Sequence, residues 1–352
     1  MSENTNIEWC DASWNPWEGC QKVGPGCDHC YAESRNARFS GGIAINWGPG
    51  APRRRTSPTN WRKPIAWNAR PFLECRACGW RGDRPANVNG MAACPEIQCA
   101  SLDVALARRR VFCASLADVF DNSAPPTWRA ELFELIMRTP NLDWLLLTKR
   151  IGNVAQMLRE IGVDGLPDNV WLGATIVNQA EADRDIPKLL EVPARVRFLS
   201  MEPLLGPVDL CRAHIAQVKL PRVDWVIVGG ESGHGARPMH PDWARSLRDQ
   251  CAAARVAFNF KQHGEWAPGS GDFGAGRFEA AAVARNGRVA PGGHRAEDYP
   301  AGAASCDGWA MVHRVGKKVA GRLLDGRAHD EFPEGCQEST PNCALRSDAP
   351  CT

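Results

Sequence analysis

The chain repeats one pattern: a short apolar run, one or two polar residues, and then a stretch with helical periodicity. Seven runs have this form, namely NIEWC (6–10), RVFCASLAD (110–118), WLLLTKR (144–150), VWLGATI (170–176), VRFLSMEP (196–203), DWVIVGGES (224–232) and AFNFKQHG (257–264). Helices are expected between them at Trp128–Met137, with Thr127 as N-cap, at Ala180–Leu190 and at Asp242–Ala254. Strands that alternate with helices at this spacing predict βα units and a parallel sheet. The expected fold is an α/β, TIM-like βα barrel, complete or incomplete, and a doubly wound sheet is the alternative.

Polar residues stand at the carboxyl ends of six of these runs. In both α/β architectures, ligand and catalytic sites lie at this end of the strands. The positions are Ser115 and Asp118, Thr148–Arg150, Thr175, Ser200 and Glu202, Glu231 and Ser232, and Lys261 and Gln262. Among them, the candidate catalytic residues are Glu231, Glu202, Lys149 and Lys261. A purely structural ion pair within this group is the alternative.

Two stretches interrupt the pattern and divide the chain. The barrel is expected in residues 1–37 and 109–266, with residues 38–108 as an insertion. Residues 267–308 are rich in Gly and Ala, which predicts a flexible excursion. A strand and a short helix are expected in 309–333, and a disordered tail in 334–352.

Three cysteines, Cys20, Cys27 and Cys30, follow the first run with the spacing C-x6-C-x2-C. A structural zinc ion normally takes four protein ligands. Three thiolates on a [4Fe–4S] cluster leave one iron open to an exchangeable ligand. The array therefore favours a cluster at the mouth of the sheet. Zinc is the alternative, and Cys10 is a more distant candidate for a fourth ligand.

A second group, Cys75, Cys78, Cys94 and Cys99, has the spacing C-x2-C-x15-C-x4-C. Two pairs of thiolates suit tetrahedral zinc. Such a zinc ion would be structural, because it would fold an insertion too polar to make its own core. Four unrelated thiols in a loop are the alternative.

Positive charge is concentrated near this insertion, although the formal net charge of the chain is only +2. From Arg35 to Arg84 there are 11 Lys/Arg and 2 Asp/Glu residues. Basic side chains interleaved with tryptophans suit phosphate contacts and base stacking. We therefore expect a nucleic-acid contact at Arg53, Arg54, Arg55, Trp61, Arg62 and Lys63. Alternatively, the tryptophans attach the insertion to the barrel and the arginines form its solvated rim.

The start of the chain, MSENTNIEWCDASWNPW, has no basic region followed by an apolar run. No apolar stretch approaches the ~20 residues of a membrane helix. A cytoplasmic protein without a membrane partner is expected. In that reducing compartment, clustered cysteines indicate metal sites rather than disulfides.

Eight segments together carry a resemblance to a known family: WNPWEGC…GCDHCYAE, WGPGAPRRRTS, VFCASLADVFD, LLTKR, NVWLGATI, FLSMEPLLGPVDL, DWVIVGGESGHGARPM and KQHGEW. They resemble the phage-associated three-Cys-motif, radical-SAM-like uncharacterised proteins, over about residues 5–265 and 309–333. The resemblance implies a [4Fe–4S] cluster, S-adenosyl-L-methionine (SAM) on its open iron, and a three-Cys-motif partner protein. The usual superfamily spacing is C-x3-C-x2-C with an aromatic residue before the last cysteine. Here the first gap is six residues long and His29 takes the place of the aromatic residue.

The resemblance also implies roles for single residues. Gly229, Gly230 and Glu231 are similar to a Gly-Gly-Glu element that contacts the amino group of SAM, and Ser115 and Asp118 stand where that element usually occurs. Lys149 and Arg150 could hold the SAM carboxylate or a substrate phosphate. The glycine pair could instead allow a close backbone approach. The implied function is radical SAM chemistry on nucleic acid or a nucleotide, as DNA modification or repair. A non-catalytic Fe–S or zinc protein that binds nucleic acid and acts through a partner is the alternative.

Overall fold

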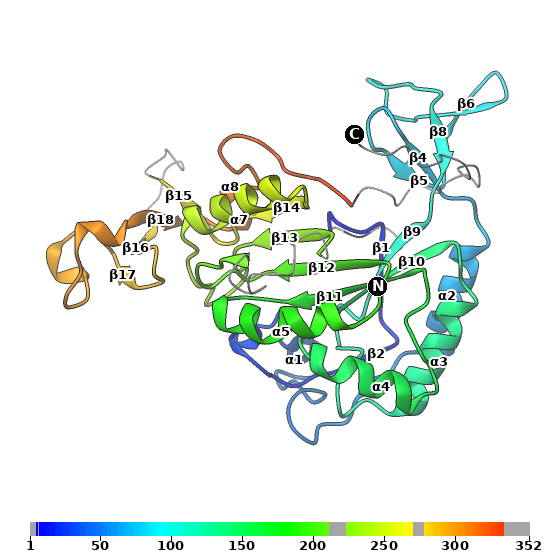
Figure 1. Cartoon of the computed structure of the whole chain (residues 1–352), viewed down its shortest axis with the longest axis horizontal. Coiled ribbons are helices and arrows are strands. Elements are labelled where there is room, and N and C mark those ends of the chain that lie inside the picture. Colours follow the sequence, from blue (N-terminus) through cyan, green and yellow to red (C-terminus); the bar gives the residue numbers. More distant parts are fainter. Residues whose placement is uncertain (1–4, 6, 211–222, 270–277, 334–352) are drawn as a thin grey trace, which may run out of the picture.

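The computed structural model describes residue 5 and residues 7–210, 223–269 and 278–333 of the chain. Its centre is a curled parallel sheet, a half-barrel in which the strand order follows the chain order (Figure 1). The seven strands are β1 (Ala12–Trp14), β9 (Arg109–Cys113), β10 (Leu142–Thr148), β11 (Val170–Thr175), β12 (Val196–Met201), β13 (Trp225–Gly229) and β14 (Ala257–Gln262). The predicted βα architecture is confirmed in this coarse form. Within the described residues β1 and β14 are the sheet edges, so no complete TIM barrel is formed, and the order never reverses as a doubly wound sheet requires.

The first strand is not where the sequence predicts it. The prediction covers residues 6–10, of which residue 6 lies outside the described part of the chain, whereas β1 begins at Ala12 and pairs with Val111 of β9. Trp9 and Cys10 precede the strand and are buried within the curl of the sheet. The ring of Trp9 packs on Phe112, with centroids 4.5 Å apart. This apolar run therefore fills the interior of the half-barrel instead of pairing with its neighbour.

Helices on the convex side of the sheet include the three that the sequence predicts, at nearly the expected bounds (Figure 1). These helices are α3 (Pro126–Met137), α5 (Gln179–Glu191) and α7 (Pro241–Ala254). The N-cap of α3 is Pro125 and not Thr127, because Pro126 takes the first helical position, where a missing N–H is tolerated. The Asn178 side chain caps α5 by accepting a hydrogen bond from the backbone N–H of Glu181. The other helical elements of the described residues are α1 (Tyr31–Phe39), α2 (Pro58–Asn68), α4 (Val154–Glu160), α8 (Lys317–Ala320) and the 3-10 turns η1 (Pro25–Cys27), η2 (Ile151–Asn153), η5 (Ala296–Asp298) and η6 (Ser305–Asp307).

The concave side of the sheet holds an aromatic cluster, Trp9, Phe112, Trp171, Phe198 and Trp225. Gly173 makes room for it, because a Cβ atom at that position would lie 2.3 Å from the Phe198 ring. Trp171 and Trp225 stand at or next to the starts of their strands. The apolar filling therefore lies toward the amino ends of the strands and leaves their carboxyl ends to polar side chains.

The predicted insertion, residues 38–108, is not one separate unit. Its first part joins the half-barrel, because β3 (Arg54–Arg55) pairs with β2 (Trp17–Glu18) and the Trp14 indole donates to the carbonyl of Asn60 at 2.9 Å. Only the following segment, residues 73–106, forms a cysteine-rich lobe at one end of the central sheet (Figure 1). Its strands are β4 (Leu73–Cys75), β5 (Arg81–Gly82), β6 (Ala86–Val88), β7 (Met91–Ala93) and β8 (Val104–Leu106).

A second small sheet corrects the prediction of a flexible excursion at 267–308. Except for residues 270–277, which are not described, this stretch contributes strands and turns to an antiparallel sheet of β15 (Trp266–Pro268), β18 (Ala310–Arg314), β16 (Glu279–Val283) and β17 (Val289–Pro291). The alanines that suggested a linker are its core, since Ala281, Ala282, Ala284 and Ala290 are buried. The strand and helix predicted in 309–333 are β18 and α8, and the predicted disordered tail lies outside the described residues.

None of the helices in the described ranges combines the length and the apolar character that crossing a bilayer requires.

Candidate functional site

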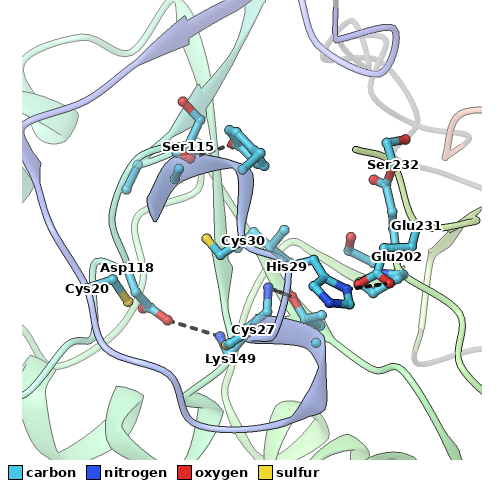
Figure 2. A pocket seen from close by; sticks show the side chains of 18 of the residues that line it. Cys20, Cys27, His29, Cys30, Ser115, Asp118, Lys149, Glu202, Glu231 and Ser232 are labelled. Atoms are coloured by element: carbon cyan, nitrogen blue, oxygen red, sulfur yellow. Dashed lines mark hydrogen bonds and ion pairs between the residues drawn. The ribbon is translucent and has the colours of Figure 1, made fainter. Parts of the chain in front are cut away.

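A cavity of about 440 Å³ opens at the carboxyl ends of the parallel strands, under the loop that carries the first three cysteines (Figure 2). Cys20, Cys27 and Cys30 all line it. Ile7, Trp9, Phe112 and Leu147 form its apolar wall. The structure also brings the predicted strand-end side chains to this cavity from six strands: Ser115, Asp118, Thr148, Lys149, Arg150, Thr175, Ser200, Glu202, Glu231, Ser232, Lys261 and Gln262.

The cysteine loop, residues 19–30, connects β2 to α1. Its first residue must be glycine, since Gly19 has φ +115° and a Cβ atom there would lie 2.6 Å from the carbonyl oxygen of Asn46. Pro25 opens the turn η1, which ends at Cys27, and Cys30 directly precedes α1. The carbonyl of Cys20 accepts a hydrogen bond from Gly48 N–H at 2.9 Å. Local turns and the neighbouring loop around Gly48 thus hold the three cysteines so that they line one cavity.

The three sulfurs do not converge on one point. Among the described residues, the only group of three or more whose metal-binding atoms all lie within 4.8 Å of one another is the second cysteine group, so at least one pair of the Sγ atoms of Cys20, Cys27 and Cys30 is farther apart than that. A single zinc ion, with Zn–S bonds of about 2.3 Å, requires thiolates about 3.8 Å apart. A cluster is ligated through separate iron atoms and holds its thiolates at a wider spacing. Cys10 does not line the cavity, and its thiol contacts the carbonyl of Ile7 at 3.7 Å.

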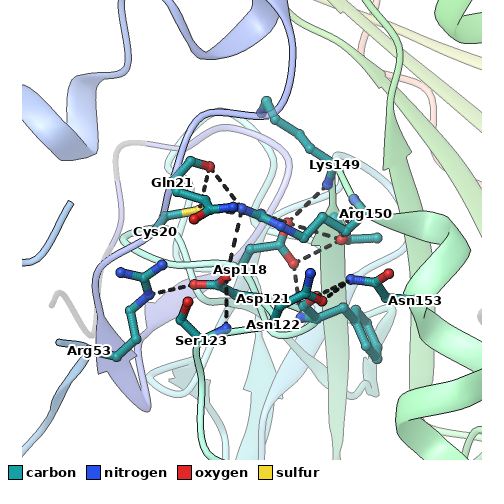
Figure 3. Close-up of polar contacts among 12 residues, drawn as sticks. Cys20, Gln21, Arg53, Asp118, Asp121, Asn122, Ser123, Lys149, Arg150 and Asn153 are labelled. Atoms are coloured by element: carbon teal, nitrogen blue, oxygen red, sulfur yellow. Dashed lines mark hydrogen bonds and ion pairs between the residues drawn. The ribbon is translucent and has the colours of Figure 1, made fainter. Parts of the chain in front are cut away.

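Arg150 ties this loop to the strand ends (Figure 3). Its guanidinium donates to Cys20 Sγ at 3.4 Å, to the carbonyl of Gln21 at 2.8 Å and to Asp118 Oδ2 at 3.1 Å. Burial and the charge of Asp118 raise the pKa of the Cys20 thiol to about 11, against the opposing effect of Arg150. The guanidinium is buried and fully engaged, so it is not available for the carboxylate or phosphate of a ligand.

Asp118, which we expected to contact SAM, also has its carboxylate engaged within the protein. Besides Arg150, it accepts hydrogen bonds from Thr148 Oγ1 at 2.8 Å, from Lys149 N–H at 3.1 Å and from Phe120 N–H at 2.9 Å. These contacts join the ends of β9 and β10 beneath the cysteine loop. The role that the geometry gives Asp118 is positioning.

Glu231 is likewise held by protein partners. Its carboxylate accepts from Arg237 Nε and Nη2 at 2.8 and 2.6 Å and contacts His29 Nδ1 at 3.0 Å. Burial raises the pKa of Glu231, but the hydrogen bonds from Arg237 and His29 outweigh burial and leave this pKa below its usual value. Gly230 permits a close backbone approach, since a Cβ atom there would lie 2.0 Å from the carbonyl oxygen of His263, and Gly229 does not line the cavity. The Gly-Gly-Glu segment thus anchors the loop through His29.

The remaining candidate catalytic residues form a second polar group. Lys261 Nζ donates to both carboxylate oxygens of Glu202, at 2.9 and 2.8 Å, and the Gln262 amide donates to the same carboxylate at 2.9 Å. Lys149 is different, because the hydrogen bond of its Nζ is to Thr175 Oγ1 at 3.4 Å and not to an acidic group. Ser115 is held by the Asn15 side chain at 3.0 Å, and its carbonyl accepts from the hydroxyl of Tyr31.

The second cysteine group does converge. Cys75 Sγ lies 3.7 Å from Cys99 Sγ, and Cys78 Sγ lies 3.5 Å from Cys94 Sγ, close to the separation of about 3.8 Å in a tetrahedral zinc–thiolate site. Burial raises the pKa of Cys75, but hydrogen bonds from the backbone of Cys78 and Ala77 more than offset it and bring this pKa to about 7. The pKa of Cys94 is instead raised to about 12, by burial and by its hydrogen bonds to neighbouring thiols, so the proximity of the four sulfurs carries the argument for a metal site. Four close cysteines therefore form a site that could hold a metal ion.

Comparison with known proteins matches residues 4–333 to the model of a family described as "Protein of unknown function (DUF5131)". The chain belongs to this family. No curated protein and no solved structure matches it. The family model spans the half-barrel, the cysteine-rich lobe and the C-terminal sheet, so the cavity and both cysteine groups lie within the matched residues of this DUF5131 member.

The structure separates the predicted nucleic-acid residues of this DUF5131 chain into two sets. The Arg53 side chain is fully buried in an ion pair with Asp121 at 2.5 Å, which excludes it from a phosphate contact. Arg54 and Arg55 pair with Glu18 and Glu131. Trp61 and Trp14 pack in a T-shaped arrangement, with ring centroids 5.3 Å apart, as the structural alternative predicts. Arg62 and Lys63 remain exposed on α2.

Sequence reasoning missed Arg237, which holds Glu231 and also pairs with Asp28 at 2.9 Å and donates to the carbonyl of Pro25 at 2.9 Å. It fastens the cysteine loop to the end of β13. Asp28 is 209 residues away in the chain, so no local spacing signals the contact. The preceding GESGHG segment, rich in glycine, indicates only a turn.

Proposed function

We propose that this chain is a radical-SAM-like iron–sulfur enzyme that acts on a nucleotide or on nucleic acid, as DNA modification or repair. The observation that supports it is the placement of Cys20, Cys27 and Cys30 on one loop that faces a deep cavity at the carboxyl ends of a curled parallel sheet. Their Sγ atoms do not all lie within 4.8 Å of one another, which favours ligation through separate iron atoms over a single zinc ion.

The residues around the loop fit such a group. Arg150 donates a hydrogen bond to Cys20 Sγ, and hydrogen bonds to cluster-ligating sulfurs tune the potential. The apolar wall of Trp9, Phe112 and Leu147 limits the access of water. When bound, a reduced [4Fe–4S] cluster with SAM on its open iron would supply a 5′-deoxyadenosyl radical to the cavity.

Acceptors for the ammonium of SAM differ from those first expected. Glu231, Asp118 and Glu202 are each engaged by a cation of the protein. We therefore propose the side-chain amide oxygen of Gln262 for this role. Gln262 Oε1 is buried and has no hydrogen-bond partner among the described residues, which identifies it as an unsatisfied acceptor in the cavity lining. Lys261 holds the Glu202 carboxylate in place.

For the lobe of residues 73–106 we propose a structural zinc ion on Cys75, Cys78, Cys94 and Cys99. The near-tetrahedral sulfur spacing supports this choice of metal. The lobe has little apolar core of its own, since Val88, Met91 and Leu106 are exposed, so a metal would supply most of its folding energy.

A second candidate function is a non-catalytic Fe–S or zinc protein that binds nucleic acid and acts through a partner, such as a three-Cys-motif partner protein. It is favoured by the exposed basic residues Arg62 and Lys63 on α2 together with a lobe whose four cysteines could hold a metal ion. In both versions we propose a cytoplasmic location.

The deciding experiment is anaerobic reconstitution of the full chain with iron and sulfide. Wild type should hold about four irons per cluster, and Cys20→Ala/Cys27→Ala/Cys30→Ala should be colourless. Cys306→Ala is the matched control, because it removes an exposed thiol outside the cavity. The reduced wild type should then release 5′-deoxyadenosine from SAM. Iron bound equally by the triple variant would refute the cluster site, and iron without SAM cleavage would favour the non-catalytic function.

A further inference from the structure

The register of the central sheet places one cation and two hydroxyls side by side in the cavity. Leu147 pairs with Gly173, which pairs with Phe198 on the next strand. Two residues further on, Thr175 pairs with Ser200, and Lys149 directly follows β10. Side chains two residues apart point to the same face of a strand. Lys149, Thr175 and Ser200 therefore form the next layer on the concave side, between the aromatic cluster and the carboxyl ends of the strands.

The charges around this layer leave Lys149 available. The three cavity carboxylates are engaged elsewhere: Asp118 by Arg150, Glu231 by Arg237, and Glu202 by Lys261. Within the described residues Lys149 forms no ion pair. Glu181, whose pKa the charge of Lys149 lowers slightly, is also engaged, because its carboxylate accepts from the backbone N–H of Val177 at 3.0 Å.

The hydroxyl groups are also available. Thr175 Oγ1 accepts from Lys149 and keeps its own proton to donate. Among the described residues, the Ser200 side chain makes no hydrogen bond, although the residue is buried and lines the cavity. An ammonium and two hydroxyls at the ends of three adjacent strands therefore offer hydrogen-bond donors to the cavity, and no carboxylate pairs with the ammonium.

We propose that Lys149, Thr175 and Ser200 bind a phosphate group of a nucleotide, a proposal that rests on the proposed function for the identity of the substrate class. A phosphate offers three strong acceptor oxygens and can accept from all three donors, whereas a carboxylate has two oxygens. The site lies beneath the cysteine loop, because a Cβ atom on Gly26 would lie 3.5 Å from Lys149 Cε. A nucleotide anchored here extends toward the three thiols.

The test is a ³¹P NMR titration of the full chain with inorganic phosphate and with the four deoxynucleoside 5′-monophosphates, without iron or SAM. Wild type should broaden and shift the phosphorus signal of at least one nucleotide. Lys149→Met should weaken binding about ten- to one-hundredfold, as expected for one charged hydrogen bond, and Ser200→Ala and Thr175→Val should each weaken it a few-fold. Lys188→Met, which removes a surface lysine of α5 outside the cavity, is the matched control and should bind as wild type does.

Thermal melts followed by circular dichroism verify that each variant is folded. If Lys149→Met does not fold, Thr175→Val and Ser200→Ala still decide the test. Phosphate binding that is absent in wild type, or equal in Lys149→Met, overturns the proposal. So does Lys149-dependent binding of L-methionine, the carboxylate probe, without binding of any phosphate. A chain that binds nucleotides but no iron would retain this site while losing the radical function.

Discussion

Replacing Arg150 by methionine should destabilise the protein strongly, because it breaks a buried ion pair at the centre of the site. The side chains of Arg150 and Asp118 are only 6% and 7% exposed, and their closest atoms lie 3.1 Å apart. Methionine fills much of the space of the arginine stem but leaves the Asp118 carboxylate without a counter-charge. Loss of one partner of such a pair typically costs about 3–5 kcal/mol.

The assay is urea unfolding followed by far-UV circular dichroism, with the free energy of unfolding extrapolated to water. Arg184→Met is the matched control, since Arg184 is 54% exposed and its partner Asp185 keeps a second cation, Lys188, at 3.2 Å. Its loss should cost less than about 1 kcal/mol.

A double variant tests whether the uncompensated charge causes the loss. Asp118→Asn removes the charge but keeps an acceptor for Thr148 Oγ1. In the double variant with Arg150→Met, the destabilisation should be smaller than the sum of the single values by about 0.5–3 kcal/mol. Additive single effects, or an Arg150→Met loss no larger than that of Arg184→Met, would refute the reasoning.

Three further predictions concern the periphery of the molecule. Cys75→Ser/Cys78→Ser should lose one zinc equivalent and expose residues 73–106 to proteolysis while the half-barrel keeps its far-UV spectrum; unchanged zinc content would contradict this. Hydrogen bonds from two arginines lower the pKa of Asp325 from 3.8 to about 2, so the stability it contributes should be present above pH 4 and be lost as the pH falls toward 2. Asp325→Asn should flatten that part of the stability profile, and an unaltered profile would assign the acid sensitivity to other groups. Arg62→Glu/Lys63→Glu should weaken binding of single-stranded DNA and lower its salt dependence, since up to two phosphate contacts are lost; binding that ignores the substitution would exclude α2 as the contact.

The interaction partners of the site explain where sequence reasoning failed. Arg53 was counted with the phosphate-binding residues because it belongs to a run of three arginines, yet it is buried against Asp121, 68 residues away. Glu231 follows two glycines, which suggested a ligand contact, yet it binds His29, 202 residues away. In each case the fold decides the ion-pair partner. The local sequence around Arg53 or Glu231 is the same whether the side chain is free to bind a ligand or is paired within the protein.

What the sequence determined by itself is local or periodic. The alternation of apolar runs and helical patterns depends on short-range backbone preferences and on side-chain spacing, and it correctly indicated six of the seven parallel strands and three helices. Polar strand ends were readable for the same reason, since the carboxyl ends of parallel strands share one edge. The Cys-x2-Cys pairs place their thiols close together through short loops.

The tertiary structure alone decided the curl of the sheet, its incomplete closure and the neutralisation of charges in the cavity. Burial and ion pairing depend on which residues the fold brings together across long chain separations, and their free energies depend on desolvation by those neighbours. Lys149 illustrates this difference. Its sequence neighbours Thr148 and Arg150 are both engaged in the network around Asp118, and only the register of β10, β11 and β12 places its ammonium beside two hydroxyls instead of a carboxylate.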